Sequence, residues 1–227
     1  MLYILAYMVL GLPMKLLYPT KVLHKERLPK SKRVIVTSNH YRNMDCILYD
    51  FKFARKFRFM AKKELFKNKL FGSVLKGLGA FPVDRDNFSP SVYKKTISLL
   101  KDNKTVFIFP EGTRNKKGTE EMLDVKSGII AFASRGEAEI VPMLIYRKSR
   151  IFRKNYIIVG ETFKIEGENP KRLTKDEVAQ NLQRYEETMK NLRQELEEYV
   201  ENKKNKNKKL EKKSLKQIED VKEKMQK

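Results

Sequence analysis

A histidine and an aspartate follow a run of apolar residues, and their types and spacing suit acid–base chemistry. The run Val34–Ser38 leads directly to His40, and Asp45 stands five residues further on. A neutral imidazole that is oriented by a carboxylate can accept a proton from a hydroxyl group near pH 7. Residues five apart are separated by about 140° around a helix, so a turn must lie between them. A helix capped by Asn43 would carry Asp45 in its first turn and leave His40 on the preceding loop.

Two more apolar runs end close to an arginine. Gly79–Val83 leads through one aspartate to Arg85, and Phe107–Phe109 leads into Pro110-Glu111-Gly112-Thr113-Arg114. A guanidinium group matches phosphate oxygens in a bidentate geometry, and glycine lets the backbone approach a ligand closely. Because the carboxyl ends of parallel strands meet at one edge of a sheet, these arginines predict a phosphate site near the histidine.

These blocks, with a fourth at Val141-Pro142-Met143, closely resemble in type and order the 1-acylglycerol-3-phosphate acyltransferase family of the glycerolipid acyltransferases. The resemblance covers residues 30–165 and includes the segment Lys62–Phe66. It implies that His40 is the general base and that Asp45 orients it. It also implies that the glycerophosphate is bound by Arg85, Gly112, Thr113 and Arg114. By the same resemblance, Glu111 positions the substrate, and Val141 and Pro142 line the acyl-binding region.

The resemblance further implies a reaction. A fatty acyl group would pass from acyl-CoA or acyl carrier protein to the free hydroxyl of lysophosphatidic acid, giving phosphatidic acid without a cofactor. We expect direct transfer, because Cys46 begins an apolar run and suits a small buried hydrophobe better than a nucleophile. Tyr41, Arg42 and Asn43 stand where family members often have small residues, which leaves the preferred acceptor open and makes Arg42 a candidate phosphate contact.

Other interpretations stay open at this point. The acceptor could be a different lyso-lipid, or the chain could be a non-catalytic, basic membrane-binding module, although such a module is expected to lose His40 or Asp45. Nucleic-acid binding rests only on the net charge of +22, and no recognition motif accompanies it, so we expect no nucleic-acid partner. One cysteine and two histidines exclude an intrachain disulfide and predict no metal site, and His24 is interpreted as structural or exposed.

The elements that must position these residues can be predicted from the hydrophobic pattern. Apolar, β-branched runs predict strands at Val34–Ser38, Phe57–Met60, Ala80–Val83, Thr105–Phe109, Ile140–Tyr146 and Tyr156–Val159. Helices are predicted from Pro90 to Leu100, with Ser89 as the cap, over Val125–Arg135 before Gly136 ends it, and from the capping box Thr174/Glu177 to about Tyr199. The alternation predicts a single α/β domain with a largely parallel or mixed sheet flanked by helices.

The two ends of the chain differ from this central domain. Residues 1–14 carry no charged side chain but are interrupted by Gly11 and Pro13, so we expect an N-terminal helical segment, residues 1–23, that dips into the membrane rather than a clean span. The acyltransferase domain is then residues 24–200, and the Lys-rich residues 201–227 are expected to be a disordered or frayed tail. The basic body predicts association with the cytoplasmic face of a bacterial cell membrane.

Overall fold

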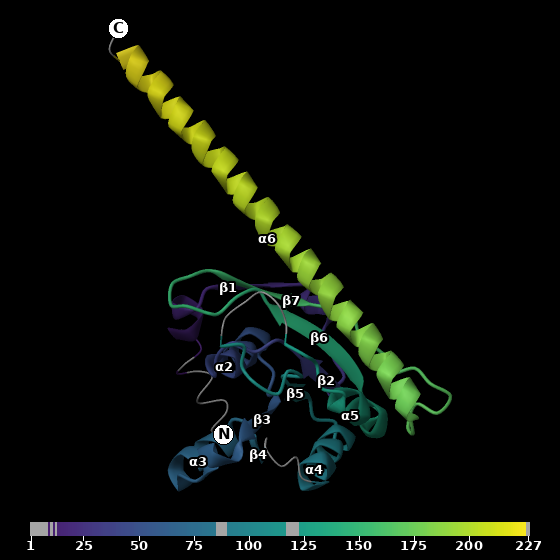
Figure 1. The fold of residues 1–227 in the computed structure, drawn as a ribbon. Coiled ribbons are helices and arrows are strands. Elements are labelled where there is room, and N and C mark those ends of the chain that lie inside the picture. The colour runs from purple at the N-terminus through teal and green to yellow at the C-terminus, as the bar shows by residue number, and fades with distance from the viewer. Residues whose placement is uncertain (1–8, 10, 12, 85–89, 117–122, 226–227) are drawn as a thin grey trace.

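A central sheet determines where the loops with the candidate residues meet. The computed structural model describes residues 9, 11, 13–84, 90–116 and 123–225. The strands are Thr20–Leu23 (β1), Val34–Thr37 (β2), Arg58–Lys62 (β3), Phe81–Val83 (β4), Val106–Ile108 (β5), Glu139–Ile145 (β6) and Asn155–Val159 (β7). They form one sheet in the order β1-β7-β6-β2-β5-β3-β4 (Figure 1). All neighbouring pairs are parallel except β6 and β7, so the mixed-sheet prediction is confirmed.

Helices cover both faces of this sheet. They are Met44–Phe53 (α2), Lys69–Gly77 (α3), Pro90–Lys101 (α4), Gly128–Gly136 (α5) and Lys175–Met225 (α6), with short 3-10 turns at Lys25–Arg27 (η1) and Lys63–Phe66 (η2). One core cluster joins α4, α5 and α6 to side chains such as Ile35 and Ile140. A second joins α2 to side chains such as Val36 and Val141. The strands therefore bury both faces, which explains their near-continuous apolar sequences.

Local signals in the sequence explain several helix ends. The capping box at the start of α6 is formed, with the Thr174 N–H donating to Glu177 at 2.7 Å and the Glu177 N–H donating to Thr174 Oγ1 at 3.2 Å. Gly136 serves a different purpose from the expected helix stop, because Glu137 is the residue with the left-handed φ of 50°. A Cβ at Gly136 would lie 2.4 Å from Leu100, so glycine is needed there for close packing of α5 on α4.

The N-terminal prediction needs one correction. Residues 20–23, assigned to the membrane-associating segment, form strand β1, which pairs in parallel with β7. Their short sequence, with a lysine at its second position, carries little of the apolar signal that marked the inner strands. Residues 1–8, 10 and 12 lie outside the described residues, so most of the predicted anchor stays a prediction. Within the described part of the chain, no helix combines the length and apolarity that crossing a bilayer requires.

The C-terminal region also differs from the expectation of a frayed tail. Helix α6 continues from the capping box to Met225 as a single helix of 51 residues (Figure 1). Its first half packs on the sheet through the buried residues Tyr185, Met189, Leu192, Leu196 and Val200, and residues 201–209 are exposed apart from the half-buried Lys203. Residues 201–225 contain no glycine or proline but ten Lys and four Glu, which are good helix formers. Helix propensity therefore extends the element beyond the point where burial ends.

Candidate active site

The loops that follow β2 and β5 lie side by side at one edge of the sheet. The two strands pair in parallel, with Thr37 beside Ile108, so both chains leave the sheet at the same edge. Two hydrogen bonds then tie the loops together. The His40 N–H donates to Glu111 Oε1 at 3.3 Å, and the Asn115 N–H donates to the His40 carbonyl at 2.7 Å. The first and third sequence blocks are thus brought into contact, as predicted.

Asp45 organises the loop that carries His40. Its carboxylate oxygen Oδ2 accepts hydrogen bonds from the backbone N–H groups of Tyr41 at 2.8 Å and Arg42 at 2.7 Å. The same oxygen lies 3.1 Å from Nδ1 of His40. Asp45 is in the first turn of α2, which begins at Met44 just after Asn43, so the predicted turn between the pair is present. The side chain of Asn43 makes no capping hydrogen bond, which departs from the expected cap.

The His40 ring is held on its face as well as at Nδ1. It stacks on Phe109, with ring centroids 3.9 Å apart and planes 15° apart. Its side chain is only 4% exposed. When Nδ1 donates its hydrogen to Asp45, Nε2 keeps the lone pair that a base requires. The arrangement therefore provides an oriented imidazole with one nitrogen available to a substrate.

Glu111 lies behind the base rather than in open solvent. Its side chain is 3% exposed, and it reaches His40 through the backbone N–H. Burial raises the pKa of Glu111 to about 7, an effect that hydrogen bonds from the His40 and Leu123 amides oppose and the nearby Asp45 reinforces. A buried carboxyl that ionises near neutral pH can change the position and the electrostatic environment of the loop that carries His40.

An apolar cavity of about 260 Å³ opens beside the base. Its walls come from the strands β3, β4 and β5, from the following loop and from α5, and the lining residues are His40, Met60, Val83, Ile108, Phe109, Pro110, Gly112, Lys126, Gly128, Ile129 and Phe132. Most of these side chains are hydrocarbon, so the cavity suits an alkyl chain that extends away from His40.

A second, cationic pocket of about 510 Å³ is lined in part by the residues that follow His40. Tyr41, Arg42, Asn43, Met44, Arg114, Lys116 and Lys148 line it. Its cations come from three loops, and Arg42 joins two of them by donating from Nη1 to the Ser149 carbonyl at 3.0 Å. Four positive side chains around one pocket provide an anion site. Because Arg42 stands only two residues after His40, this pocket lies close to the base.

The remaining predicted site residues lie in different environments. Gly112 has a φ of 67°, and a Cβ there would lie 2.8 Å from Lys126 Cε, so this turn favours glycine. Thr113 is exposed between Gly112 and Arg114. Arg85 lies outside the described residues. Val141 and Pro142 are buried in β6 next to Val36 and Thr37, and they do not line the apolar cavity.

Sequence reasoning missed several residues that the structure brings to the site. Lys126 lies against Gly112 at the wall of the apolar cavity. Lys148 enters the cationic pocket from the loop between β6 and β7. Their position relative to the strands could have indicated them. Lys126 stands just before the start of α5 and Lys148 just after the end of β6, where loops reach the carboxyl edge of the sheet.

Two reactive residue types are located away from the base. His24 is partly exposed and its Nε2 lies 3.1 Å from Glu195, which agrees with a structural or exposed role. Cys46 packs against the core cluster under α2. Across the described residues, no group of three His, Cys, Asp or Glu side chains could hold a metal ion.

Comparisons with known proteins identify relatives of this chain. Residues 20–146 match the family model described as Acyltransferase. The chain is 40% identical over 147 residues to a 1-acyl-sn-glycerol-3-phosphate acyltransferase of Bacillus subtilis, covering 62% of this chain and 72% of that one. It is 31% identical over 138 residues to an enzyme of the same name from Borreliella burgdorferi, covering 60% of this chain and 54% of that one. The crystal structure of the 1-acyl-sn-glycerophosphate acyltransferase PlsC from Thermotoga maritima superposes with a TM-score of 0.58 at 24% identity, over 80% of this chain and 72% of the other, and supports the fold.

Proposed function

The chain belongs to the acyltransferase family, and we propose that it acylates the free hydroxyl of 1-acyl-sn-glycerol 3-phosphate to make phosphatidic acid. The observation that carries this proposal is the position of His40. Its ring lines the apolar cavity, while its neighbours Tyr41 and Arg42 line the cationic pocket. A substrate with a hydrocarbon chain and a phosphate would occupy both spaces and present its hydroxyl between them.

His40 acts as the base in the proposed reaction. Nε2 takes the proton of the acceptor hydroxyl as its oxygen attacks the thioester carbonyl, so a C–O bond forms and the C–S bond then breaks. The proton is passed to the departing thiolate, and no acyl-enzyme is required. Asp45 supports this role by holding Nδ1 at 3.1 Å, which fixes the tautomer and stabilises the imidazolium. Phe109 supports it by keeping the ring plane fixed.

The cationic pocket is the proposed site of the glycerol phosphate. Arg42, Arg114, Lys116 and Lys148 provide its positive charge, and the arginines can bind phosphate oxygens in pairs. Binding the phosphate there restrains the glycerol hydroxyl close to His40, and such positioning is a major source of rate enhancement. Thr113, Gly112 and Arg85 belong to the same proposed phosphate-binding set on the basis of the family resemblance.

Positive groups also line the cavity that contains the base. Lys126 and the first residue of α5, Gly128, both line the cavity that contains His40. The N-terminus of a helix carries a partial positive charge and unpaired N–H groups, which stabilise an oxyanion. We assign the oxyanion to this side of the cavity. We assign the hydrocarbon chain of the acceptor to the apolar part of the cavity, which Ile129 and Phe132 line.

The acyl donor is acyl-CoA or acyl carrier protein, both of them anionic thioesters that suit a strongly basic protein. We place the reaction at the cytoplasmic face of the membrane, because the acceptor and product are lipids and the chain carries a net charge of +22.

An acceptor panel tests the proposed function. Purified protein is given labelled acyl-CoA or acyl carrier protein with lysophosphatidic acid, monoacylglycerol or lysophosphatidylcholine. We expect transfer to lysophosphatidic acid, and little transfer to monoacylglycerol because it lacks the phosphate. Equal rates with lysophosphatidic acid and monoacylglycerol would show that the cationic pocket does not bind the acceptor. No transfer to any of the three acceptors would refute the function.

A further inference from the structure

Exposed apolar side chains are concentrated in three segments. Among the described residues the large exposed ones are Val9, Leu16, Leu65, Leu70, Phe71, Val74, Leu123, Ile151 and Phe152. All but Leu123 belong to the N-terminal segment, to η2 and α3, or to the loop between β6 and β7. Isolated exposed apolar residues are normal on a protein surface, but groups of them mark interaction sites.

Helix α3 has its apolar face turned outward. Leu70 is 79% exposed, Phe71 49% and Val74 37%, whereas the only buried residue of the helix is Gly72. A Cβ at Gly72 would lie 3.0 Å from the Phe66 carbonyl, so α3 packs against the neighbouring η2 through its glycine. An amphipathic helix of a soluble domain normally packs its apolar stripe inward. The reversed orientation of α3 therefore indicates an external apolar partner.

The loop at residues 147–154 has a similar design. Ile151 is 55% exposed and Phe152 is 76% exposed at its tip. The backbone of Phe152 has a φ of 58°, which is unfavourable for an aromatic residue, and its N–H donates to the Leu17 carbonyl at 2.7 Å. Backbone strain that holds an aromatic ring in solvent is more often associated with function than with stability.

Both segments combine this apolar surface with positive charge. Residues 65–83 contain three lysines and no acidic residue. The loop contains Arg147, Lys148, Arg150, Arg153 and Lys154 among its eight residues, again without an acidic residue. Lysine and arginine around an apolar face are typical of helices and loops that lie in the headgroup region of anionic bilayers. Self-association through these surfaces would bring like charges together, which disfavours a second copy as the partner.

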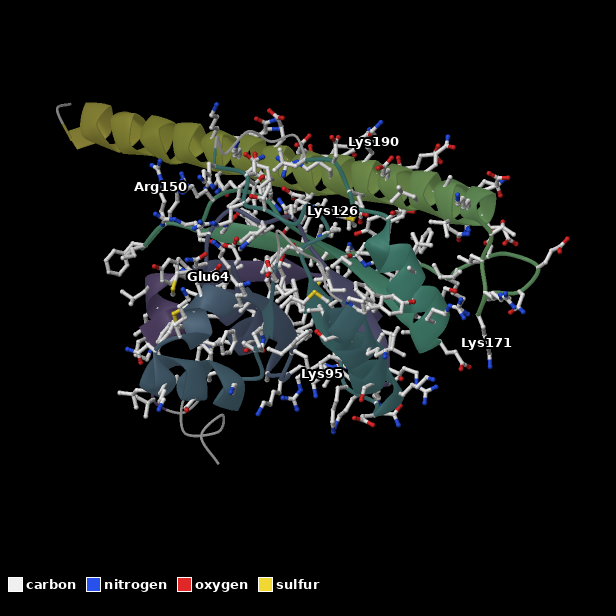
Figure 2. All side chains as sticks on the ribbon, turned by 60° about the horizontal axis from the view of Figure 1, so that its bottom comes forward. Glu64, Lys95, Lys126, Arg150, Lys171 and Lys190 are labelled. Atoms are coloured by element: carbon white, nitrogen blue, oxygen red, sulfur yellow. The ribbon has the colours of Figure 1, made fainter. Side chains whose placement is uncertain are left out.

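The two segments lie at the same end of the molecule. Figure 2 shows Arg150, in the loop, and Glu64, in η2 just before α3, at one end, whereas Lys190 on α6 and Lys171 lie toward the other. Two separate apolar and basic surfaces at one end can contact a broad flat surface together. A small partner protein would have to span both, so the arrangement favours a bilayer.

We propose that the exposed face of α3 (Leu70, Phe71 and Val74) and the loop tip (Ile151 and Phe152) form a docking surface that inserts into the headgroup region of anionic phospholipid bilayers. The loop also contributes Lys148 to the cationic pocket, so docking brings this pocket to the level of lipid phosphates. The docking surface consists of residues outside the N-terminal segment, and the Phe152 N–H joins it to that segment at Leu17. It extends the proposed function by giving the enzyme a defined orientation on the membrane that supplies its acceptor.

The absence of tryptophan from the chain allows a direct test. A single tryptophan is introduced as Phe71→Trp, as Phe152→Trp, or as the control Lys190→Trp on the exposed outer side of α6. Each full-length protein is mixed with phosphatidylglycerol or phosphatidylcholine vesicles, with and without lipids that carry a quencher at the headgroup or mid-chain. Acyl transfer is measured separately in detergent micelles.

We expect the emission of Phe71→Trp and Phe152→Trp to shift to the blue with phosphatidylglycerol vesicles and to be quenched most by shallow quenchers, while Lys190→Trp does not change. Unchanged emission at positions 71 and 152 when the protein co-sediments with vesicles, or no co-sedimentation at all, overturns the proposal. A blue shift with acyl carrier protein but not with vesicles would also overturn it, in favour of a protein partner. Normal transfer in micelles without docking refutes only this inference, whereas docking without transfer refutes only the proposed function.

Discussion

At the scale of single residues, one buried carboxylate holds the site together. Asp45 accepts two backbone N–H groups of the loop and contacts the imidazole through the same oxygen, so it fixes both the path of the loop and the direction of the ring. Charge-assisted hydrogen bonds of this kind are stronger than neutral ones. The loop and the base are therefore coupled through a single side chain.

Asp45→Asn should separate the geometry of the site from its charge. Because one oxygen contacts all three groups, the amide oxygen of asparagine can still accept the N–H groups of Tyr41, Arg42 and Nδ1, but it carries no negative charge to stabilise the imidazolium. We expect kcat to fall on the order of 10²- to 10⁴-fold, with little change in KM for the acceptor. Steady-state kinetics check this, with melting temperature as the control for folding. A kcat within threefold of wild type would contradict the role of Asp45.

The sequence was sufficient to predict the His40–Asp45 pair and the turn between them, because the spacing and the strand end constrain both. It could not predict the stacking of Phe109 or the approach of Lys126 to Gly112, which depend on contacts between loops. The assignment of Val141 and Pro142 to an acyl pocket came from the resemblance, and the structure buries both in β6 while Ile129 and Phe132 line the cavity.

At the scale of elements, helix α2 contains a second unusual carboxyl near its C-terminal end. Asp50 accepts the backbone N–H of Phe57 at 3.1 Å and is 9% exposed. Burial raises the pKa of Asp50 to about 8, although the Phe57 N–H, Lys56 and Arg58 all act to lower it. A carboxyl whose pKa is higher in the folded state favours folding at low pH, and that contribution is lost as pH rises through the folded pKa.

Asp50→Asn should therefore flatten the dependence of stability on pH. Asparagine keeps an oxygen that can accept from Phe57 and cannot ionise. Between pH 6 and 9 we expect wild type to lose about 2–3 kcal/mol more unfolding free energy than the variant, because only the unfolded carboxyl is ionised until the pH reaches the folded pKa of about 8. The raised pKa of Glu111 is present in both proteins, so both keep the same contribution of Glu111 to the change of unfolding free energy with pH. Urea unfolding at the two pH values measures the difference, and parallel slopes would show that Asp50 does not titrate in this range.

Element prediction succeeded where burial is uniform and failed where it is not. The inner strands are apolar throughout because helices cover both faces, so β2, β5 and β6 were readily found. Strand β1 lies at an edge, is only four residues long and includes Lys21, so its pattern is weak. Helix α3 was not predicted, and its outward apolar face shows why an apolar stripe alone does not tell which side is buried.

At the scale of the whole molecule, α6 has two halves with different roles. Residues up to Val200 pack on the sheet, and Tyr185 donates a hydrogen bond to Thr37 Oγ1 at 2.7 Å directly below the His40 loop. Beyond this point the helix runs past the domain (Figure 1). The sequence marked the change at residue 201 through its Lys-rich composition, but composition does not determine whether the segment is helical.

Truncation after residue 203 should leave the domain intact. We expect the melting temperature to change by only about 2 °C, whereas Leu192→Ala within the packed half should lower stability by about 2–5 kcal/mol. Thermal melts of the two variants, followed by circular dichroism, provide the comparison. A large loss of melting temperature in the truncated protein would mean that the second half of α6 has a partner within the fold.

The central claim is that His40 is the base of an acyl transfer, and it is tested most directly by comparing the two histidines of the chain. Transfer of a labelled acyl group to lysophosphatidic acid is measured for wild type, His40→Ala and the matched control His24→Ala. We predict that His24→Ala retains wild-type activity and that His40→Ala loses on the order of 10²- to 10⁴-fold in kcat with its fold intact. Activity of His40→Ala within tenfold of wild type would contradict the mechanism.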